Sequence, residues 1–438
     1  MKLRLSVMMF LQYAIWGAWL PILFPYLGGF LKFSDGQCSA ILAGGAAGAI
    51  VGPFIAGQVA DRFFATERFL AFSHLIGAVL VWFLASVRDF DTFLAVSVIY
   101  GVIYAPTLAL TNSISFHHLE DRDRDFGRVR LWGTIGWIVA GIVVGQWLAL
   151  RYSPGGMQGD ALMSEWNRGR ADAFKLSAVV GGILGLYSFT LPHTPPRKDA
   201  VAGNAVLEAL AFVRRQPLLT LFLLAVPMSC VHQFYFVHTA AFLSRFQSGA
   251  AGEFARSIND FLGVGGGGLM TIGQMSEIAV LALVTVLAKR MSRKTLLALG
   301  LAAYAVRMAL FAYTDHVVPV LIGVSLHGFC FGCFIFVAFM VVDEETPADV
   351  RASAQNLFNL VIVGLGIIVG SWFAVSQVGA WAKQQVGVAA AATEVPIELQ
   401  REFFTLLFAV PMWIALACLI ALLLFYPGGR RPAAAEAR

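Results

Sequence analysis

Stretches of about twenty mostly apolar residues recur along almost the whole chain, and only short polar connections separate them. Each stretch is long enough to cross a bilayer as a helix, because a helix rises about 1.5 Å per residue and the hydrocarbon core is about 30 Å thick. Of the 438 residues, 58% are hydrophobic and 13% are charged, against roughly 25% charged residues in soluble proteins. This composition excludes a cytosolic globule and a disordered chain. The sequence therefore predicts an all-α membrane protein with many spans.

Twelve transmembrane helices are predicted. The first follows Lys2 and Arg4 and continues to about residue 31, which is too long for the apolar part of a cleaved signal peptide. The other spans are expected near 40–60, 69–86, 93–115, 127–150, 174–191, 218–243, 264–288, 295–313, 317–342, 352–377 and 403–426.

The spans divide six against six around a proline-containing basic connection at 192–217. We therefore expect a six-helix bundle at 1–191, a cytoplasmic linker at 192–217, a second six-helix bundle at 218–426 and a cytoplasmic tail at 427–438. Within the linker, Ala205 to Val213 has the pattern of a short amphipathic helix on the inner surface of the membrane. The tail from Pro432 is expected to be disordered.

Lysine and arginine are concentrated in the loops on the side of the amino terminus, which the positive-inside rule assigns to the cytoplasm. Both termini are therefore predicted to be cytoplasmic. The net charge of +5 reflects this topology, so no nucleic-acid partner is expected. The outer loops hold fewer cations, among them Arg88, Arg151, Arg168 and Lys175.

A short motif between the second and third spans carries family information. Gly57, Asp61 and Arg62 reproduce the start of a G-x-x-x-D-R motif, although Phe64 and Ala65 replace its later glycine and basic residue. This motif and the six-plus-six outline resemble the major facilitator superfamily, whose halves are parallel repeats. The matching loop of the second half, Lys289–Lys294, has no acid, and plain positive-inside charge accounts for it.

Glu277 is the only acidic residue well inside a predicted span. It precedes Lys289 by twelve residues, which places it about 18 Å from the inner boundary, and Gln274 shares its helix face. A structural reading, in which the protonated acid only joins helices, is the alternative. The functional reading is favoured because a buried acid costs several kcal/mol, and such a carboxyl group can couple substrate movement to protons.

A second group of candidates lies in the span 127–150. Arg130, Thr134 and Trp137 are spaced i, i+4 and i+7, so a cation, a hydroxyl group and an aromatic ring share one helix face. The alternative for Arg130 is an ordinary positive-inside residue at the inner boundary, because the span is just long enough to reach from Arg130 to Arg151.

Other polar residues within the spans have functional and structural interpretations. Gln233 offers an amide donor and acceptor, and His327, with Phe331 one turn later, fits a binding role as well as it fits helix–helix contact. The remaining ones are interpreted as structural: His232 and His238 through packing, Arg307 through snorkelling or a local pair, and Gln12, Asn112 and Asn359 through hydrogen bonds between helices.

The amides, cation, carboxyl group and aromatic rings within the spans together suit a neutral, planar, hydroxyl-rich ligand. Its rings would stack on aromatic side chains, and its polar edges would take directional hydrogen bonds. No phosphate loop, metal cluster or nucleophile with its base is found in the sequence. We therefore expect a protein that is not an enzyme and has no cofactor or metal ion.

Several strings resemble the nucleoside:proton symporter family of the major facilitator superfamily. They include Trp16-Gly17-Ala18-Trp19, Arg130-Leu131-Trp132-Gly133-Thr134-Ile135-Gly136 and Arg351-Ala352-Ser353-Ala354-Gln355. The resemblance implies a twelve-helix facilitator of the bacterial inner membrane. It would import nucleosides with protons by alternating access, as a monomer, with the ligand in a central cavity between the two bundles.

The resemblance also implies the residues of the binding site. It assigns the nucleoside to Arg130, Thr134, Trp137, Gln233, Gln274 and Glu277, to which we add His327 and Phe331 as candidates, with Glu277 as the proton carrier. Phe236 stands where the family carries an asparagine, Gly332 where it carries an aspartate, and His327 where it carries a tyrosine. The missing aspartate removes one candidate proton carrier, for which His327 is a candidate replacement.

Two other functions compete with nucleoside symport. A facilitator for another neutral hydroxyl-rich solute, such as a sugar or a cell-wall fragment, with or without proton coupling, would use the same kinds of groups. A membrane-embedded enzyme is the third, and the absence of a catalytic group in the sequence disfavours it.

Overall fold

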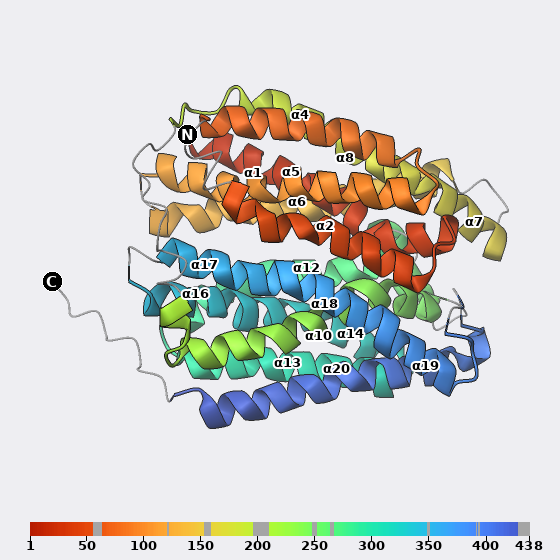
Figure 1. Cartoon of the computed structure of the whole chain (residues 1–438). Coiled ribbons are helices and arrows are strands. Elements are labelled where there is room, and N and C mark those ends of the chain that lie inside the picture. Colours follow the sequence, from red (N-terminus) through yellow and green to blue (C-terminus); the bar gives the residue numbers. More distant parts are fainter. Residues whose placement is uncertain are drawn as a thin grey trace. The chain divides into compact units, whose positions relative to one another are not determined.

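The structure is a computed structural model, which describes residues 1–55, 64–120, 122–152, 159–195, 210–247, 252–262, 267–347, 351–390, 392 and 395–427. All regular elements within these ranges are helices, so the predicted all-α membrane fold is confirmed (Figure 1). The predictions for Gly57, Asp61 and Arg62, for most of the helix at 205–213 and for the tail from Pro432 concern residues outside these ranges.

The chain divides into two compact units. Unit 1 consists of Met1–Val201 and Leu243–Thr271, and unit 2 consists of Ala202–Phe242 and Ile272–Arg438. The connection that follows the first helix of unit 2 thus belongs to unit 1. The predicted bundle limits at 191 and 218 stay a prediction.

Unit 1 is built from three pairs of long helices. The pairs are α1 with α6, α2 with α5, and α4 with α8, and α11 also contacts α6. In order, the elements are α1 (Lys2–Phe24) with its π-helical extension η1 (Pro25–Phe30), α2 (Asp35–Ile55), α4 (Thr66–Leu84), α5 (Phe90–His118), α6 (Arg122–Arg151), α7 (Gly159–Gly169), α8 (Ala171–Ser188), η3 (Arg245–Gln247) and α11 (Glu253–Leu262).

In unit 2 two long helical runs are interrupted by π-helical segments. The elements are α10 (Leu218–Ser244), α12 (Gly267–Leu287) and α13 (Arg293–Tyr313), then the run α14 (Val317–Ser325), α15 (His327–Phe329), η5 (Cys330–Phe336) and α16 (Val337–Glu345). A second run contains α17 (Arg351–Asn359), η6 (Leu360–Leu365), α18 (Gly366–Trp372), η7 (Phe373–Gly379) and α19 (Ala380–Gln385), and α20 (Ile397–Phe425) ends the unit.

Glycines bring paired helices of unit 1 into backbone contact. A methyl group on Gly101 of α5 would overlap the carbonyl group of Gly45 in α2, and one on Gly136 of α6 would overlap the carbonyl group of Phe10 in α1. Small residues allow such close approach, and the van der Waals packing that results helps helices associate in lipid, where no hydrophobic force drives them together.

The same order of pairing occurs within unit 2. A methyl group on Gly370 of α18 would lie 2.9 Å from the Cα atom of Cys230 in α10, and one on Gly273 of α12 would lie 2.9 Å from the carbonyl oxygen of Val324 in α14. The third pair is α13 with α20. In each unit, therefore, the first long run pairs with the fifth, the second with the fourth and the third with the sixth, as expected for parallel repeats.

Aromatic side chains fill much of the interior of each unit. In unit 1, the Trp19 and Phe174 rings stack with their centroids 5.8 Å apart. In unit 2, the Phe242 ring lies 5.2 Å from Phe311 and 5.1 Å from Phe408, which joins α10, α13 and α20. These contacts hold together helices that are distant in the sequence.

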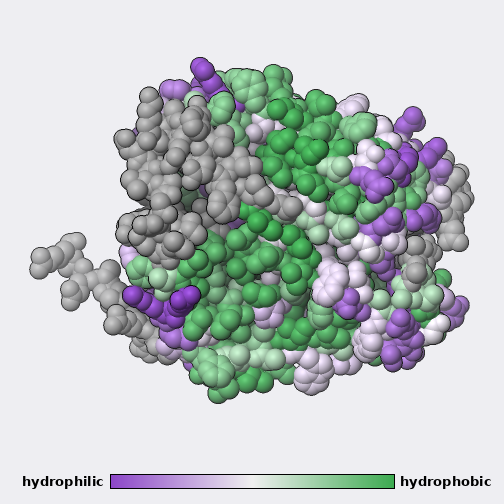
Figure 2. Space-filling view, viewed as in Figure 1, coloured by the Kyte–Doolittle hydropathy of each residue, from purple (hydrophilic) through white to green (hydrophobic). Residues whose placement is uncertain are grey.

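Nine helices within the described ranges are long and apolar enough to cross a membrane, against twelve predicted. They are Lys2–Phe30, Thr66–Leu84, Phe90–His118, Asp125–Arg151, Leu218–Ser244, Arg293–Tyr313, Val317–Glu345, Leu357–Gln385 and Ile397–Phe425. Helices α2, α8 and α12 lie at the other three predicted spans, and α12 contains the shorter apolar segment Gly268–Val284. On the face shown in Figure 2, hydrophobic residues cover the middle of the helices and hydrophilic residues gather near the helix ends.

The contact between α2 and α5 predicts that one added methyl group strongly lowers the stability of the protein. We expect Gly101→Ala to destabilise the protein by roughly 1–3 kcal/mol, because the methyl group would force the two backbones apart. The matched control is Gly182→Ala in α8, where no atom lies within 4 Å of the added group. Thermal unfolding of the detergent-purified variants measures both effects, and equal melting temperatures for the two would contradict the proposed contact.

Candidate functional site

A buried arginine forms the centre of a polar cluster in unit 2. The Arg307 side chain on α13 has an exposed fraction of 0%. Its Nη1 atom donates a hydrogen bond of 3.0 Å to Nδ1 of His327 on α15. Its guanidinium carbon lies 4.5 Å from the ring centroid of Tyr235 and 4.9 Å from that of Tyr304. We call these four residues and Glu277 the Arg307 cluster.

The arginine determines where His327 holds its proton. A guanidinium group only donates hydrogen bonds, so Nδ1 of His327 must accept, and the neutral ring carries its hydrogen on Nε2. That Nε2 atom lies 3.7 Å from Oε2 of Glu277 on α12. The distance is too long for a direct hydrogen bond, so the neutral ring meets the carboxyl group only through the dipole of its N–H bond. His327 therefore connects the acid on α12 with the cation on α13.

Aromatic rings fix the orientation of His327. The Tyr235 ring stacks on it with a centroid distance of 4.6 Å and an interplanar angle of 18°, and the His232 ring lies nearly parallel to it at 5.6 Å. His232 is itself hydrogen-bonded through Nδ1 to the Tyr304 hydroxyl group at 2.7 Å. Phe236 meets the His232 ring edge-on at 5.0 Å. The surroundings of His327 are thus a rigid aromatic frame.

The Glu277 carboxyl group is the more accessible end of the cluster. The exposed fraction of its side chain is 15%, against 3% for His327. Gln274, one turn earlier on α12, is also partly exposed. A proton can therefore reach Glu277 more easily than it can reach the histidine behind it.

Gln233 and Phe331, the other predicted residues of unit 2, have different surroundings. Gln233 is buried, and a methyl group on Gly370 of α18 would lie 2.7 Å from its Cγ atom, so its aliphatic part packs on α18. Phe331 is partly buried in η5. The structure therefore brings Glu277 and His327 together, whereas Gln233 faces another helix.

The three predicted residues of α6 belong to unit 1. The Arg130 guanidinium carbon lies 4.0 Å from the ring centroid of Tyr13 on α1. The Trp137 ring meets Trp16 of α1 edge-on, with centroids 6.2 Å apart. Thr134 lies between them along α6 and is partly exposed. Arg130 and Trp137 thus both contact α1, and they remain partly exposed beside it.

The side of α1 that carries these rings is held against α5. Nε2 of Gln12 donates a hydrogen bond of 2.9 Å to the Thr107 hydroxyl group, and the Tyr104 hydroxyl group donates one of 2.6 Å to the Gln12 carbonyl oxygen. The interpretation of Gln12 as a residue that joins helices is confirmed. Trp16 also contacts Tyr104, at 5.7 Å between centroids.

Arg307 is a central residue of this cluster, although its position in a span predicted only a structural role. Snorkelling is wrong, because the side chain is fully buried, and the local pair is the hydrogen bond to His327. Tyr235 and Tyr304 were not among the candidates. Helical spacing carried a signal, because Tyr304 precedes Arg307 by three residues and Tyr235 follows His232 by three.

Gly332, for which the resemblance predicts an aspartate in other family members, has apolar neighbours on α12. A Cβ atom on Gly332 in η5 would lie 2.9 Å from Cγ1 of Val280 and 3.6 Å from Cγ2 of Val284, both on α12. Glu277 lies one turn before Val280 on the same face of that helix. A side chain at this position would therefore meet two valines of α12, and Glu277 is the acid on the same face of that helix.

The chain is similar to known transporters over almost its whole length. A family model described as nucleoside H+ symporter matches residues 1–428. The putative nucleoside transporter YegT of Escherichia coli K12 is 32% identical over 375 residues, which cover 84% of this chain and 82% of YegT. The nucleoside permease NupG of the same organism is 28% identical over 382 residues, covering 84% and 86%.

A solved structure agrees with the fold. The crystal structure of the nucleoside transporter NupG superimposes with a TM-score of 0.75 at 25% identity, and the match covers 97% of this chain and 99% of that one.

The Arg307 cluster predicts coupling between two charges. We expect Arg307→Met to destabilise the protein by about 3–5 kcal/mol, because it removes the buried cation behind the His327–Glu277 contact and leaves His327 without this hydrogen-bond donor. Adding Glu277→Gln removes the remaining charge, so the double variant is expected to be more stable than Arg307→Met alone. Thermal unfolding of the parent, both single variants and the double variant measures this coupling. Simple additivity of the two effects would show that the charges do not interact.

Proposed function

The chain belongs to the nucleoside H+ symporter family, and from this premise we propose that it imports nucleosides with protons by alternating access, with Glu277 as the proton carrier. Its function is proton-coupled nucleoside transport, and it is a multi-pass membrane transporter, not an enzyme. We further propose that it works as a monomer in a bacterial inner membrane, without a nucleic-acid partner. The excess of lysine and arginine in the loops on the same side of the membrane as the amino terminus supports cytoplasmic termini.

The observation that carries the proposed coupling is the path from Glu277 through His327 to Arg307. A fully buried guanidinium group needs a compensating negative charge, because an unpaired charge in a low-dielectric interior is very unfavourable. The Glu277 carboxylate supplies it through the intervening imidazole ring. Protonation of Glu277 cancels that charge and so favours a different arrangement of the cluster.

Coupling requires that protonation of Glu277 favours one conformation of the transporter over the other. A ligand shifts a conformational equilibrium only by as much as its affinities for the two states differ. The proton affinity of Glu277 differs between the two arrangements of the cluster, because only one arrangement needs the carboxylate charge. His327, held by Arg307 and stacked on Tyr235, transmits the change from α12 to α13.

The nucleoside offers an aromatic base and a ribose with hydroxyl groups, and the candidate residues provide partners for both. We assign stacking to Trp137 and Phe331, and hydrogen bonds to base edges or hydroxyl groups to Gln233 and Gln274. Further polar contacts are assigned to Arg130, Thr134 and His327. Partial exposure of Arg130, Thr134, Trp137 and Gln274 supports their roles, whereas Gln233 and His327 are buried in this conformation and would need a rearrangement to reach the ligand.

Two departures from the family favour a second candidate substrate. Phe236 and Gly332 remove an amide and an acid, and both positions have apolar or aromatic neighbours. Another neutral hydroxyl-rich solute, such as a sugar or a cell-wall fragment, would depend less on those two groups. Competition of labelled uridine uptake by nucleosides, bases and sugars separates the two candidates.

We expect Glu277→Gln to abolish uphill transport. In proteoliposomes with acid outside, the parent should accumulate labelled uridine, whereas the variant should only equalise the inner and outer concentrations, because its amide cannot release a proton. Exchange of labelled for unlabelled uridine, which needs no net proton movement, should persist.

The matched control is Glu398→Gln, which changes an exposed acid at the start of α20. It should accumulate uridine like the parent. Unchanged accumulation by the Glu277 variant would exclude Glu277 as the proton carrier.

A further inference from the structure

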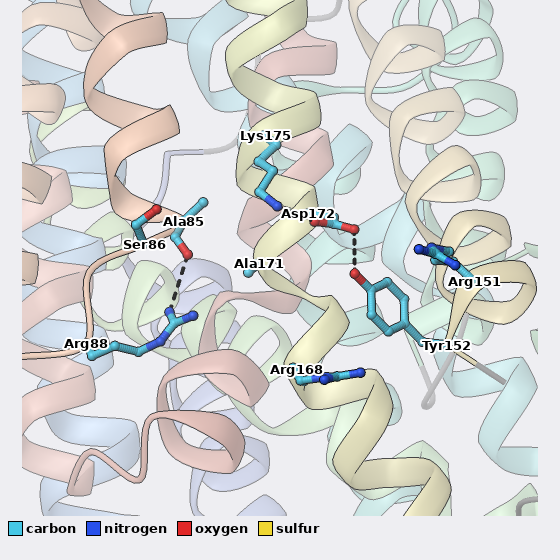
Figure 3. A pocket seen from close by; sticks show the side chains of 9 residues that line it. All are labelled: Ala85, Ser86, Arg88, Arg151, Tyr152, Arg168, Ala171, Asp172 and Lys175. Carbon is cyan, nitrogen blue, oxygen red and sulfur yellow. Dashed lines mark hydrogen bonds and ion pairs between the residues drawn. The ribbon is translucent and has the colours of Figure 1, made fainter. Parts of the chain in front are cut away.

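A cavity of about 570 Å³ lies at the end of unit 1 where α4 and α6 finish and α8 begins. Figure 3 shows the side chains that line it, including Arg88, Arg151, Arg168 and Lys175. Asp172 is the one carboxylate among the lining residues, so the lining carries an excess of positive charge. None of these residues takes part in the Arg307 cluster or in the α6 surface described above.

The four cations come from separate parts of the chain. Arg88 belongs to the connection between α4 and α5, Arg151 ends α6, Arg168 is in the last turn of α7, and Lys175 is in the second turn of α8. The fold therefore collects them, although like charges repel one another at short range. The proposed topology puts them on the outer side, where the positive-inside rule disfavours cations.

Asp172 does not neutralise this group. Its Oδ1 atom pairs with the Lys175 ammonium group at 2.8 Å. Its Oδ2 atom accepts hydrogen bonds from the Tyr152 hydroxyl group at 2.7 Å and from Nε1 of Trp147 at 2.9 Å. One acid thus serves one lysine and orients Tyr152, and it leaves the charges of the arginines to other partners.

The arginines are held in different ways. Nη1 of Arg88 donates to the Tyr26 hydroxyl group at 2.8 Å and to two backbone carbonyl groups, and its guanidinium carbon lies 5.1 Å from the Phe30 ring centroid. Nη2 of Arg168 pairs with Glu165 at 2.5 Å. Within the described ranges, the structure records no carboxylate partner for Arg88 or Arg151. Arg88 is therefore fixed in position with a charge that an outside anion can compensate.

We propose that this cavity binds a phosphate group, carried either by the headgroup of an anionic phospholipid or by a soluble phosphate ester. Arginine forks bind phosphate oxygens in pairs, and three of them line one space that is large enough for a phosphate with its substituent. The Tyr152 hydroxyl group lies among them, on Asp172. This site is separate from nucleoside transport and does not depend on it.

The experiment uses the full chain in nanodiscs. For the lipid source, native mass spectrometry compares how much phosphatidylglycerol and how much phosphatidylcholine the protein retains. For the soluble source, calorimetry in phosphatidylcholine nanodiscs measures binding of glycerol phosphate, with glycerol as the match that lacks phosphate. The test variant is Arg151→Gln combined with Arg168→Gln, because neither residue holds Tyr26 or Asp172. The control is Arg401→Gln, an exposed arginine of unit 2.

The double variant should bind the phosphate-bearing probe at least about tenfold more weakly, because it loses two charged hydrogen-bond donors, and the control should bind like the parent. A loss confined to phosphatidylglycerol identifies the lipid as the source, and a loss of glycerol phosphate binding identifies the soluble ester. The proposal is overturned if the parent neither retains more phosphatidylglycerol than phosphatidylcholine nor binds glycerol phosphate more tightly than glycerol. It is also overturned if the double variant binds as the parent does.

A thermal unfolding transition like that of the parent verifies that the double variant is folded. If the parent binds a phosphate probe at this cavity but transports no nucleoside, only the proposed function fails.

Discussion

A permanent positive charge in a low-dielectric interior must be compensated, and in unit 2 this requirement organises the candidate site. Arg307 cannot give up its proton, and no part of it is exposed. Tyr235 and Tyr304 offer their ring faces to the charge, and His327 accepts its hydrogen bond. Because the arginine occupies one nitrogen of His327, the other nitrogen presents its hydrogen to Glu277. The orientation of the acid–imidazole contact thus follows from the cation behind it.

The close pairing of helices makes this arrangement possible. Gly273 lets α12 approach α14 so closely that a methyl group there would lie 2.9 Å from the His327 Cβ atom and 2.8 Å from the Tyr235 hydroxyl group. In unit 1, Gly136 brings α6 against α1 in the same way, and Tyr13 and Trp16 then meet Arg130 and Trp137. Glycine contacts therefore position the polar and aromatic groups of both units.

The sequence predicted the fold class because lipid imposes a simple rule, a long apolar segment for each crossing. It also identified Glu277, since an acid in such a segment is conspicuous. The role of Arg307 was harder to predict, because a long side chain can reach water from many depths in the membrane. Only the hydrogen bond between α13 and α15 shows that Arg307 does not snorkel. Gln233 faces Gly370 rather than Glu277, which depends on helix rotation that spacing within one span does not determine.

The π-helical segment η5 shifts the helix face within the run Val317–Glu345. It accommodates an extra residue, and one residue corresponds to a rotation of about 100° around the helix axis. The face that His327 occupies before η5 is therefore not continued by the residues that follow at regular helical spacing after Phe336. A helical wheel drawn through the whole run would merge two phases, and substitutions before and after η5 must be grouped separately to reveal which side faces lipid.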